Sequence, residues 1–368
     1  MISRDCLLLA VALAAAPVRA FPAQDAWKGS VTNEGGVIVV SNPKQPIHSR
    51  PVLELREDLR IGGPPSGAEP VFNKVRGLVV DDEGGVYVLD WGDSLVKAFD
   101  ASGRCLRTIS RPGQGPGELD RPFSISFNRT ARELAVLQVS RRISYFRTDG
   151  TFLRQTPLRG VLALLGRVDS RGNIFVEEAV LDRENPRTET KKLDPSAEPV
   201  ATFGASPSSR LGRTNPTRPI AWWTLDAGDN LVYGYPESYE IRIFSAADNH
   251  EVRRITRDYD PVEVTRREKE RWREASPPET ELELSDHHSA YRSFFLSDEG
   301  HIFVQTWEDA GDGRAVHDIF DPEGRFIGRI PLRPSGVEIR RGKYYAIEED
   351  DEGYQVVKRY AVKWNVHR

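Results

Sequence analysis

Apolar and polar residues alternate in short runs along most of the chain, and turns rich in Asp and Gly separate these runs. The clearest example spans residues 77–110, where the pattern predicts strands at Gly77–Val80, Val86–Asp90, Leu95–Phe99 and Arg104–Ile109. Two-fold alternation interrupted by Asp/Gly turns is typical of an antiparallel meander. The pattern therefore predicts a four-stranded antiparallel unit in this part of the chain.

The same order of strands and turns recurs down the chain. The first turns of five successive units are marked by Asp82, Asn128, Asp169, Asp226 and Asp298, which lie 46, 41, 57 and 72 residues apart. A core unit of about forty residues, with extra residues in the loops, is typical of propeller blades. The repeat predicts an all-β propeller built from four-stranded antiparallel blades.

The two ends of the chain complete this interpretation. The segment Gly336–Trp364 provides only three strands, and we expect the strand Leu53–Ile61 to supply the fourth. Pairing of an N-terminal strand with the C-terminal blade closes the ring and covers the edges and apolar faces of each sheet. Five full units and this composite unit predict six blades. A leading hairpin at residues 30–43 is either an accessory to the closing blade, which we favour, or half of a seventh blade.

A family resemblance rests on residues 81–109, "DDEGGVYVLDWGDSLVKAFDASGRCLRTI". This stretch resembles an NHL repeat, with its Asp-x-x-Gly turn, "YV-x-D" strand and "V-x-x-F-D-x-x-G" segment. Together with "GQGPGE" and the N-terminus, it makes the chain similar to bacterial secreted NHL-like six-bladed β-propeller proteins. The strong motif covers mainly residues 77–158, and "NRTARE" and "RRGK" depart from it in the second and sixth units. The resemblance implies a fold and an exported location rather than a particular function.

The N-terminus has the pattern of a secretory signal. Arg4 precedes the eleven-residue apolar run "LLLAVALAAAP", and "VRA" ends at the small residue Ala20. We expect a signal peptide at residues 1–20, a single six-bladed propeller domain at 21–368, and a periplasmic or extracellular location. The apolar run is too short to span a bilayer and no other segment approaches that length, so we expect no membrane span.

The net charge argues against a nucleic-acid partner, and the cysteine content argues against disulfides and cysteine-ligated zinc. The formal net charge is −4, with 51 basic and 55 acidic residues spread along the chain, which gives no electrostatic footprint for nucleic acid. Removal of the signal would leave Cys105 as the single cysteine, so we expect no intramolecular disulfide and no cysteine-ligated zinc. These features predict a soluble monomer that core burial and ring topology hold together.

In a propeller, the loops between second and third strands share one face with the links between blades, around the channel mouth. On that face we expect an aromatic and acidic rim that could bind a peptide, a glycan or a cation. Its candidate ligand-binding residues are Asp90, Trp91, Glu178, Tyr235, Glu237, Trp307, Glu308 and Asp309. The alternative is that these loops are simply polar and that their aromatic residues cap the blade cores.

Candidate chemistry is sparse. Of the histidines, His287 and His288 in "DHHSAY" approach an inner strand at the expected active face, and adjacent strand positions let at most one of them enter the channel. They are the candidate zinc ligands, while the acidic rim could hold calcium. No nucleophile elbow, phosphate loop or dinucleotide fingerprint is present. We therefore predict no catalytic residues and no cofactor, with calcium as an option.

Residues 257–286 interrupt the repeat. Thr265 and Glu268 form a capping box, Arg266–Ala275 has a helical composition, and Ser276-Pro-Pro ends it. So short a helix must dock to be stable, and we expect Trp272 to be the contact. The insert is either a strap that seals two blades or a recognition element over the channel mouth.

These observations favour an exported propeller that binds a protein, peptide or glycan on its loop face, and not an enzyme. The alternative is a metal-assisted hydrolase or lyase, of the propeller lactonase or amidating-lyase type, with calcium or zinc at the channel mouth.

Overall fold

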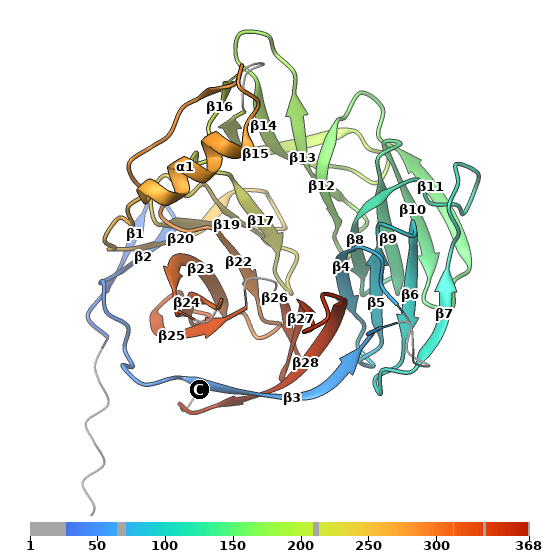
Figure 1. Cartoon of the computed structure of the whole chain (residues 1–368), viewed down its shortest axis with the longest axis horizontal. Helices are drawn as coiled ribbons and strands as arrows, with labels where there is room; N and C mark the ends of the chain where they lie inside the picture. The colour runs from blue at the N-terminus through green and yellow to red at the C-terminus, as the bar shows by residue number, and fades with distance from the viewer. Residues whose placement is uncertain (1–26, 65–70, 209–212, 312, 334–335, 367–368) are drawn as a thin grey trace, which may run out of the picture.

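The computed structural model describes residues 27–64, 71–208, 213–311, 313–333 and 336–366. In these residues six small antiparallel sheets stand in a ring around a central channel (Figure 1). The prediction of an all-β six-bladed propeller with four-stranded blades and one short helix is confirmed. The predicted signal peptide, residues 1–20, lies outside the described residues.

Each blade runs from an inner strand at the channel to an outer strand at the periphery. Blade 1 consists of β4 (Val75–Val80), β5 (Val86–Asp90), β6 (Leu95–Phe99) and β7 (Cys105–Ile109). Blade 2 consists of β8 (Pro122–Asn128), β9 (Glu133–Gln138), β10 (Arg142–Arg147) and β11 (Phe152–Pro157). Blade 3 consists of β12 (Ala163–Val168), β13 (Ile174–Val180), β14 (Arg187–Leu193) and β15 (Pro199–Pro207).

The second half of the ring follows the same plan. Blade 4 contains β17 (Trp222–Leu225), β18 (Leu231–Gly234), β19 (Glu240–Phe244) and β20 (Glu251–Arg257). Blade 5 consists of β22 (Ser293–Leu296), β23 (Ile302–Asp309), β24 (Ala315–Phe320) and β25 (Phe326–Leu332). Blade 6 consists of β26 (Gly336–Arg340), β27 (Lys343–Glu349), β28 (Gln355–Trp364) and β3 (Leu53–Ile61).

We call the face that holds the inter-blade links and the loops between second and third strands the link face. The opposite face, which holds the turns between first and second strands and between third and fourth strands, is the turn face. Every inner strand thus begins at the link face and ends at the turn face.

One side-chain device shapes the turns on the turn face. In blade 1, Asp81 Oδ1 accepts hydrogen bonds from the N–H groups of Glu83 at 3.0 Å and Gly85 at 2.7 Å, and Gly84 between them has φ of +88°. A carboxylate that bonds the backbone ahead of it replaces ladder bonds, and glycine permits the positive φ. This geometry explains why Asp at the start of the turn and Gly three residues later recur in the sequence, as at Asp169 and Gly172 of blade 3.

The structure shifts two of the sequence landmarks by one residue. In blade 1 Asp81 has this turn-forming role, and not Asp82. In blade 5 Ser297 has it, and not Asp298, because Ser297 Oγ accepts from the N–H of His301 at 2.9 Å. Each turn begins with two consecutive polar residues, Asp81-Asp82 or Ser297-Asp298, and the sequence pattern does not distinguish which of the two forms the turn. The displaced residues Asp82 and Asp298 belong instead to a network at the channel.

The N-terminal strand closes the ring as predicted. Strand β3 pairs antiparallel with β28 from Leu53 opposite Trp364 to Ile61 opposite Val357. Leu53 is 2% exposed and packs in the core shared by blades 5 and 6. Closure therefore joins two segments some 300 residues apart through both a ladder and a core.

The favoured prediction for the leading hairpin, an accessory to the closing blade, is wrong. The hairpin does not form half of a seventh blade either. It consists of β1 (Ser30–Glu34) and β2 (Val37–Asn42), and β2 pairs in parallel with β20, the outer strand of blade 4. The buried Asn42 side chain fixes this position, because its Nδ2 donates to Gly324 O at 2.9 Å and its Oδ1 accepts from Phe326 N at 2.8 Å, both in blade 5. The chain then passes along the outside of blade 5 before it enters blade 6.

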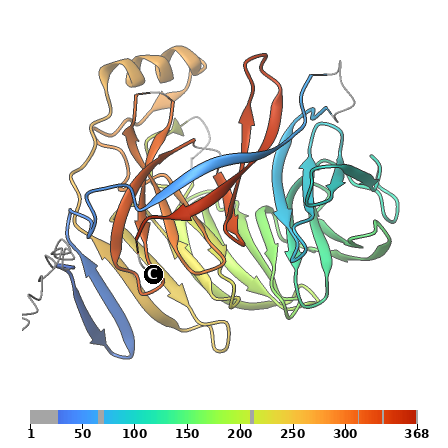
Figure 2. The same cartoon turned by 90° about the horizontal axis from the view of Figure 1, so that it is seen from below.

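The insert forms a strap on the link face, where Figure 2 shows its helix (orange) above the sheets. Helix α1 (Arg266–Ala275) has the predicted capping box, but none of its residues is buried and Trp272 is only half-buried. The strap is held by its flanks: Val264 N donates to Asp286 O at 2.8 Å, and β21 (Glu281–Leu282) pairs with β16 (Arg213–Thr214). Docking therefore depends on backbone bonds beside the helix more than on Trp272.

A buried polar cluster joins blades 4 and 5. The Asp318 carboxylate is fully buried and accepts from Tyr239 Oη at 2.6 Å, Arg257 Nη1 at 3.0 Å and Arg329 Nε at 2.8 Å. A buried carboxylate with three good donors is stable, whereas loss of one partner leaves an unpaired charge. This cluster fixes the angle between the two blades next to the strap.

Ring closure gives a first prediction. Truncation of Leu53 in the mutant Leu53→Ala removes buried methyl groups at the seam and should lower the free energy of unfolding by about 2–5 kcal/mol. The same substitution at Leu106, which is 45% exposed on the outer strand β7, should change it by less than about 0.5 kcal/mol. Urea denaturation followed by circular dichroism measures both. Equal effects of the two substitutions would contradict a stabilising seam at β3.

Burial of His317 in blade 5 gives a pH-dependent prediction. The side chain is 2% exposed, and burial lowers its pKa to about 4, although the Ala315 carbonyl near Nδ1 at 2.9 Å favours the protonated form. An unfolded His titrates near pH 6.5, so between pH 6.5 and 4 the unfolded chain binds a proton that the folded chain does not. The stabilisation is fully present above pH 6.5 and falls by about 3 kcal/mol as the pH drops to 4.

The measurement compares unfolding free energies at pH 7 and pH 4.5. His317→Gln should remove this contribution and make the pH dependence shallower, while the matched substitution of the exposed His250 should leave the dependence of the wild type unchanged. An unchanged slope in His317→Gln would show that other groups produce the acid sensitivity.

Candidate functional site

The central channel contains a cavity of about 680 Å³ whose walls are the inner strands of all six blades. The volume is within the range of small-molecule and peptide side-chain sites. Because the inner strands run from the link face to the turn face, the first residues of each strand line one half of the cavity and the last residues line the other. The two halves differ in chemistry.

Several apolar side chains line the link-face half, together with Arg76 of β4. Phe123, Leu165 and Trp222 contribute apolar side chains from blades 2, 3 and 4. Trp222 is 39% exposed, and its Nε1 donates to Phe294 O at 2.7 Å, which holds the indole in place across the joint to blade 5. A fixed aromatic ring at a cavity mouth offers contact area at small entropic cost.

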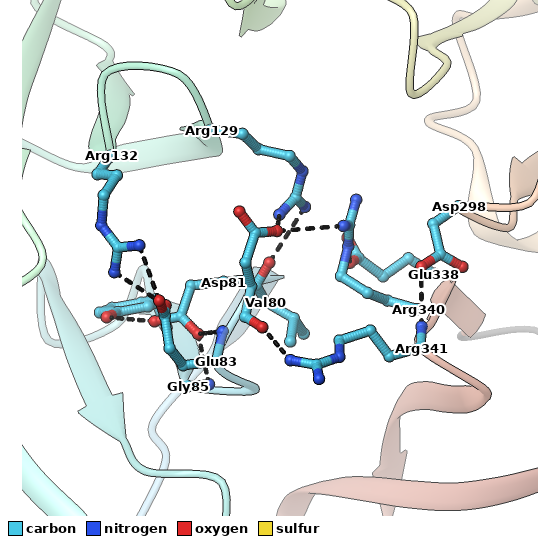
Figure 3. A network of polar contacts seen from close by, with 12 residues as sticks. Val80, Asp81, Glu83, Gly85, Arg129, Arg132, Asp298, Glu338, Arg340 and Arg341 are labelled. Atoms are coloured by element: carbon cyan, nitrogen blue, oxygen red, sulfur yellow. Dashed lines mark hydrogen bonds and ion pairs between the residues drawn. The ribbon is translucent and has the colours of Figure 1, made fainter.

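The turn-face half is charged, and Figure 3 shows part of its network. Arg129 Nη1 lies 2.7 Å from Asp82 Oδ1, and its Nη2 donates to Val80 O at 3.1 Å. Arg340 Nη1 lies 3.6 Å from the same Asp82 oxygen, while Arg340 Nε donates to Glu338 Oε1 at 3.1 Å. Asp82 of blade 1 therefore lies between guanidinium groups of blades 2 and 6.

Backbone and side-chain bonds extend this network around the mouth. Arg341 N donates to Asp298 Oδ2 at 2.9 Å, which joins blade 6 to blade 5, and Arg341 Nη1 donates to Asp82 O. On the other side, Ser170 Oγ donates to Asp229 Oδ2, which joins blade 3 to blade 4. The turns on this face thus form a connected charged rim.

The confined space changes the acid–base properties of the network. Burial raises the pKa of Glu338, and the neighbouring charges of Arg340, Arg129 and Arg167 offset this only in part. Burial and the charge of Arg340 lower the pKa of Arg129, and burial lowers that of Arg167. The guanidinium groups stay charged nonetheless. The turn-face half of the cavity therefore contains charged arginine side chains that have lost part of their hydration.

The predicted rim residues lie elsewhere, and none of the eight is among the described residues that line the cavity. Asp90 is fully buried: Lys74 N donates to its Oδ1 at 2.9 Å, and Lys97 Nζ pairs with its Oδ2 at 2.9 Å. Although burial opposes ionisation, the N–H groups of Lys74 and Asn73 and the charge of Lys97 lower the pKa of Asp90. Trp91 beside it lies under the ammonium group of Lys74, at 5.1 Å. The Asp90 carboxylate thus orders the loop before the inner strand.

The remaining rim residues form separate groups on blades 3, 4 and 5. Glu178 pairs with Lys191 Nζ at 2.7 Å, and Glu308 pairs with Arg329 Nη2 at 2.5 Å. Asp309 Oδ1 accepts from the N–H of Gly311 at 2.8 Å within its own loop. In these three cases a partner from the same chain already occupies the carboxylate.

The aromatic members of the rim differ in their surroundings. Tyr235 is half-buried in the core of blade 4, and burial, with the nearby charge of exposed Glu237, raises its pKa. Trp307 stacks on His288 with ring centroids 3.9 Å apart, and the Arg292 guanidinium lies 4.6 Å from its ring. The structure thus brings Trp307 together with the strap, and it places Tyr235 in a different blade.

The two histidines proposed as metal ligands point to opposite sides, as expected for neighbours in extended chain. His287 is exposed, and His288 is buried with its Nε2 3.4 Å from Glu268 Oε1 of α1. Burial lowers the pKa of His288, although the Glu268 charge favours its protonated form. Among the described residues, no three side chains of the His, Cys, Asp or Glu type gather closely enough to hold a metal ion. Calcium at the rim stays a prediction.

Sequence reasoning missed the residues that line the channel, above all Arg129, Arg167, Glu338, Arg340 and Trp222. A signal was present, because most residues of the inner strands are apolar or small, whereas "LLGRV", "GVEIR" and "VRGLVV" place charged residues in them. Alignment of the six inner strands would have separated these charges from the solvent-facing charges of outer strands.

Comparison with known proteins agrees with the architecture. A protein of Bacteroides fragilis described as exported has a TM-score of 0.60 at 12% identity and covers 89% of this chain and 100% of its own. A DUF4221 family member from Bacteroides vulgatus has a TM-score of 0.56 at 12% identity and covers 85% of this chain and 99% of its own. These similarities show the fold, and no curated protein is significantly similar in sequence. The family described as 6-bladed beta-propeller (DUF5128) matches residues 73–318, and the chain belongs to this family.

Proposed function

We propose that this protein is an exported, monomeric recognition module of the NHL-like type that binds a protein, peptide or glycan at the link-face mouth of its channel. The expectation of export rests on the signal-like N-terminus and on the similarity to a Bacteroides protein described as exported. The observation that carries the binding role is the exposed apolar surface around the mouth.

Five exposed large hydrophobic residues belong to the link face of blades 2, 3 and 4. They are Val139, Leu164, Leu181, Ile220 and Trp222, with exposed fractions from 39% to 80%. Scattered exposed hydrophobic residues are normal, but a concentration on one face next to a cavity is typical of an interaction site. The apolar walls of the cavity continue this surface into the molecule.

The strap borders the same face and limits how a ligand approaches. Helix α1 presents Arg266, Arg267, Arg271 and Arg273 together with acidic residues, and none of its side chains is buried. A long insert with exposed charged residues beside an apolar mouth supports a role in selecting ligands. We therefore place the binding surface between α1 and the mouth over blades 3 and 4.

The alternative hypothesis, a metal-assisted hydrolase or lyase, would need ligands that converge at the mouth. Nothing in the described residues favours it over binding. We therefore favour a binding module, whose rigid ring holds a preformed surface.

The test is a selection of ligands from a random peptide library and a glycan array with the mature protein. Trp222→Ala and Leu164→Asp should each raise the dissociation constant of the selected ligands at least about tenfold, because central aromatic and apolar contacts dominate interfaces. Leu106→Asp, the same substitution at a similarly exposed Leu on the outer strand of blade 1, should change it less than about twofold. Surface plasmon resonance gives the constants, and the unfolding temperature confirms folding. Ligands whose affinity survives both link-face substitutions would contradict this location.

A further inference from the structure

Among the described residues, Arg167 is a charged residue of the channel wall whose buried Nε has no hydrogen-bond partner. It is on the inner strand β12, two residues after Leu165, and both side chains line the cavity. Within the part of the chain that the structure describes, no ion pair or hydrogen bond joins the guanidinium to a carboxylate. Arg167 as a whole is partly buried, and a guanidinium in such a position is normally paired, so this arrangement fits an anion from outside the chain.

The neighbouring carboxylates are already engaged. Glu338 accepts from Arg340 Nε at 3.1 Å, and Asp82 is shared by Arg129 and Arg340. On the blade 4 side of the cavity, Asp226 Oδ1 accepts from the N–H groups of Gly228 and Asn230, at 2.8 and 2.9 Å. These carboxylates stabilise turns and the rim, and although the charge of Glu338 acts on Arg167, none of them hydrogen-bonds to it.

Three guanidinium groups and two carboxylates form what we call the arginine cluster: Arg129, Arg167, Arg340, Asp82 and Glu338. In this cluster Arg129 and Arg340 bond carboxylates, whereas Arg167 hydrogen-bonds to no carboxylate of the described residues and is the group that a ligand carboxylate could pair with. A planar carboxylate matches the fork of a guanidinium through two parallel hydrogen bonds. A doubly charged phosphate would place two negative charges beside the Glu338 carboxylate.

The rest of the cavity defines the other end of the ligand. Leu165 is one side-chain repeat, or about 7 Å along the strand, from Arg167 toward the link face, and Phe123 and Trp222 line the same half of the cavity. An acid held at Arg167 would extend its body past these apolar walls. Apolar contact and charge pairing would then act together in the same cavity.

We propose that the channel binds a monocarboxylic acid with an apolar body, whose carboxylate pairs with Arg167 and whose body contacts Leu165 and Trp222. The carboxylate can belong to a small organic acid or to the C-terminus of a peptide, because both present the same group. This site goes beyond the proposed recognition of a macromolecule at the link face, since it needs no contact outside the channel.

The test is isothermal titration calorimetry of the mature protein with hexanoate, at constant chloride concentration. Hexanoate should bind saturably, and neutral hexanamide at least tenfold more weakly. Arg167→Met should weaken hexanoate binding at least tenfold, and Arg107→Met, the same substitution on the exposed outer strand β7, should leave it within twofold. No saturable binding to the wild type, or equal binding to Arg167→Met, would overturn the proposal.

Further arms make the result specific. Glu338→Gln removes a competing carboxylate and should tighten hexanoate binding severalfold, which tests the cluster even if Arg167→Met does not fold; weaker binding would overturn the proposal. Inorganic phosphate that binds more tightly than hexanoate at the same site would refute the carboxylate assignment. N-acetyl-leucine, compared with hexanoate, distinguishes a peptide C-terminus from a small acid as the source of the carboxylate.

Failure of this test is distinguishable from failure of the recognition role. Trp222→Ala affects both proposals, but Arg167→Met leaves the exposed link-face residues intact. If Arg167→Met loses hexanoate binding but still binds the selected peptides or glycans normally, the result supports link-face recognition as a separate function.

Discussion

The pairing of β3 with β28 is the interaction on which the rest of the structure depends. A four-stranded blade is too small to bury both of its faces, so each blade is stable only between two neighbours. When Leu53–Ile61 completes blade 6, the last open faces are covered and the ring has no free end. Closure also fixes the width of the channel, because six blades of similar width can meet around only one radius. Every distance across the cavity follows from this closure.

Strand direction then gives the channel its two kinds of wall. All inner strands begin at the link face and end at the turn face, where Asp, Asn or Ser side chains of five turns accept from backbone N–H groups, so polar side chains accumulate at one end of the channel. Asp82 and Asp298 follow the turn-forming residues by one position and therefore face the channel, where they meet Arg129 and the backbone of Arg341. The apolar residues at the strand starts, such as Trp222, line the other end. The contrast between the two halves is a consequence of the repeat itself.

The sequence predicted the features that depend on short-range patterns. Strand bounds in blade 1, the helix cap at Thr265 and the closing strand were all readable, because turn residues and alternation act within a few positions. Placement of the leading hairpin was not readable, since β20 and β3 are both outer strands of blades and the choice between them depends on long-range bonds of Asn42. For the same reason the sequence pattern predicted both Asp90 and Trp307 as rim residues. In the structure Asp90 is fully buried and paired with Lys97, and Trp307 stacks on His288. Loop chemistry alone cannot show which side chains already have partners.

The rigid ring also explains how the fold tolerates an unpaired Arg167. An isolated buried cation is destabilising, and in a flexible loop the guanidinium would turn toward water. On β12 its backbone is fixed by the ladder to β13, with Arg167 opposite Phe175, and by the blades on either side. The ring thus maintains a partly buried charge at a defined depth, and an anion that enters meets a donor group already oriented for it. A preformed, poorly solvated guanidinium below an apolar mouth is a device for selection, because it favours ligands that bring both an apolar body and a negative charge and disfavours those that bring only one.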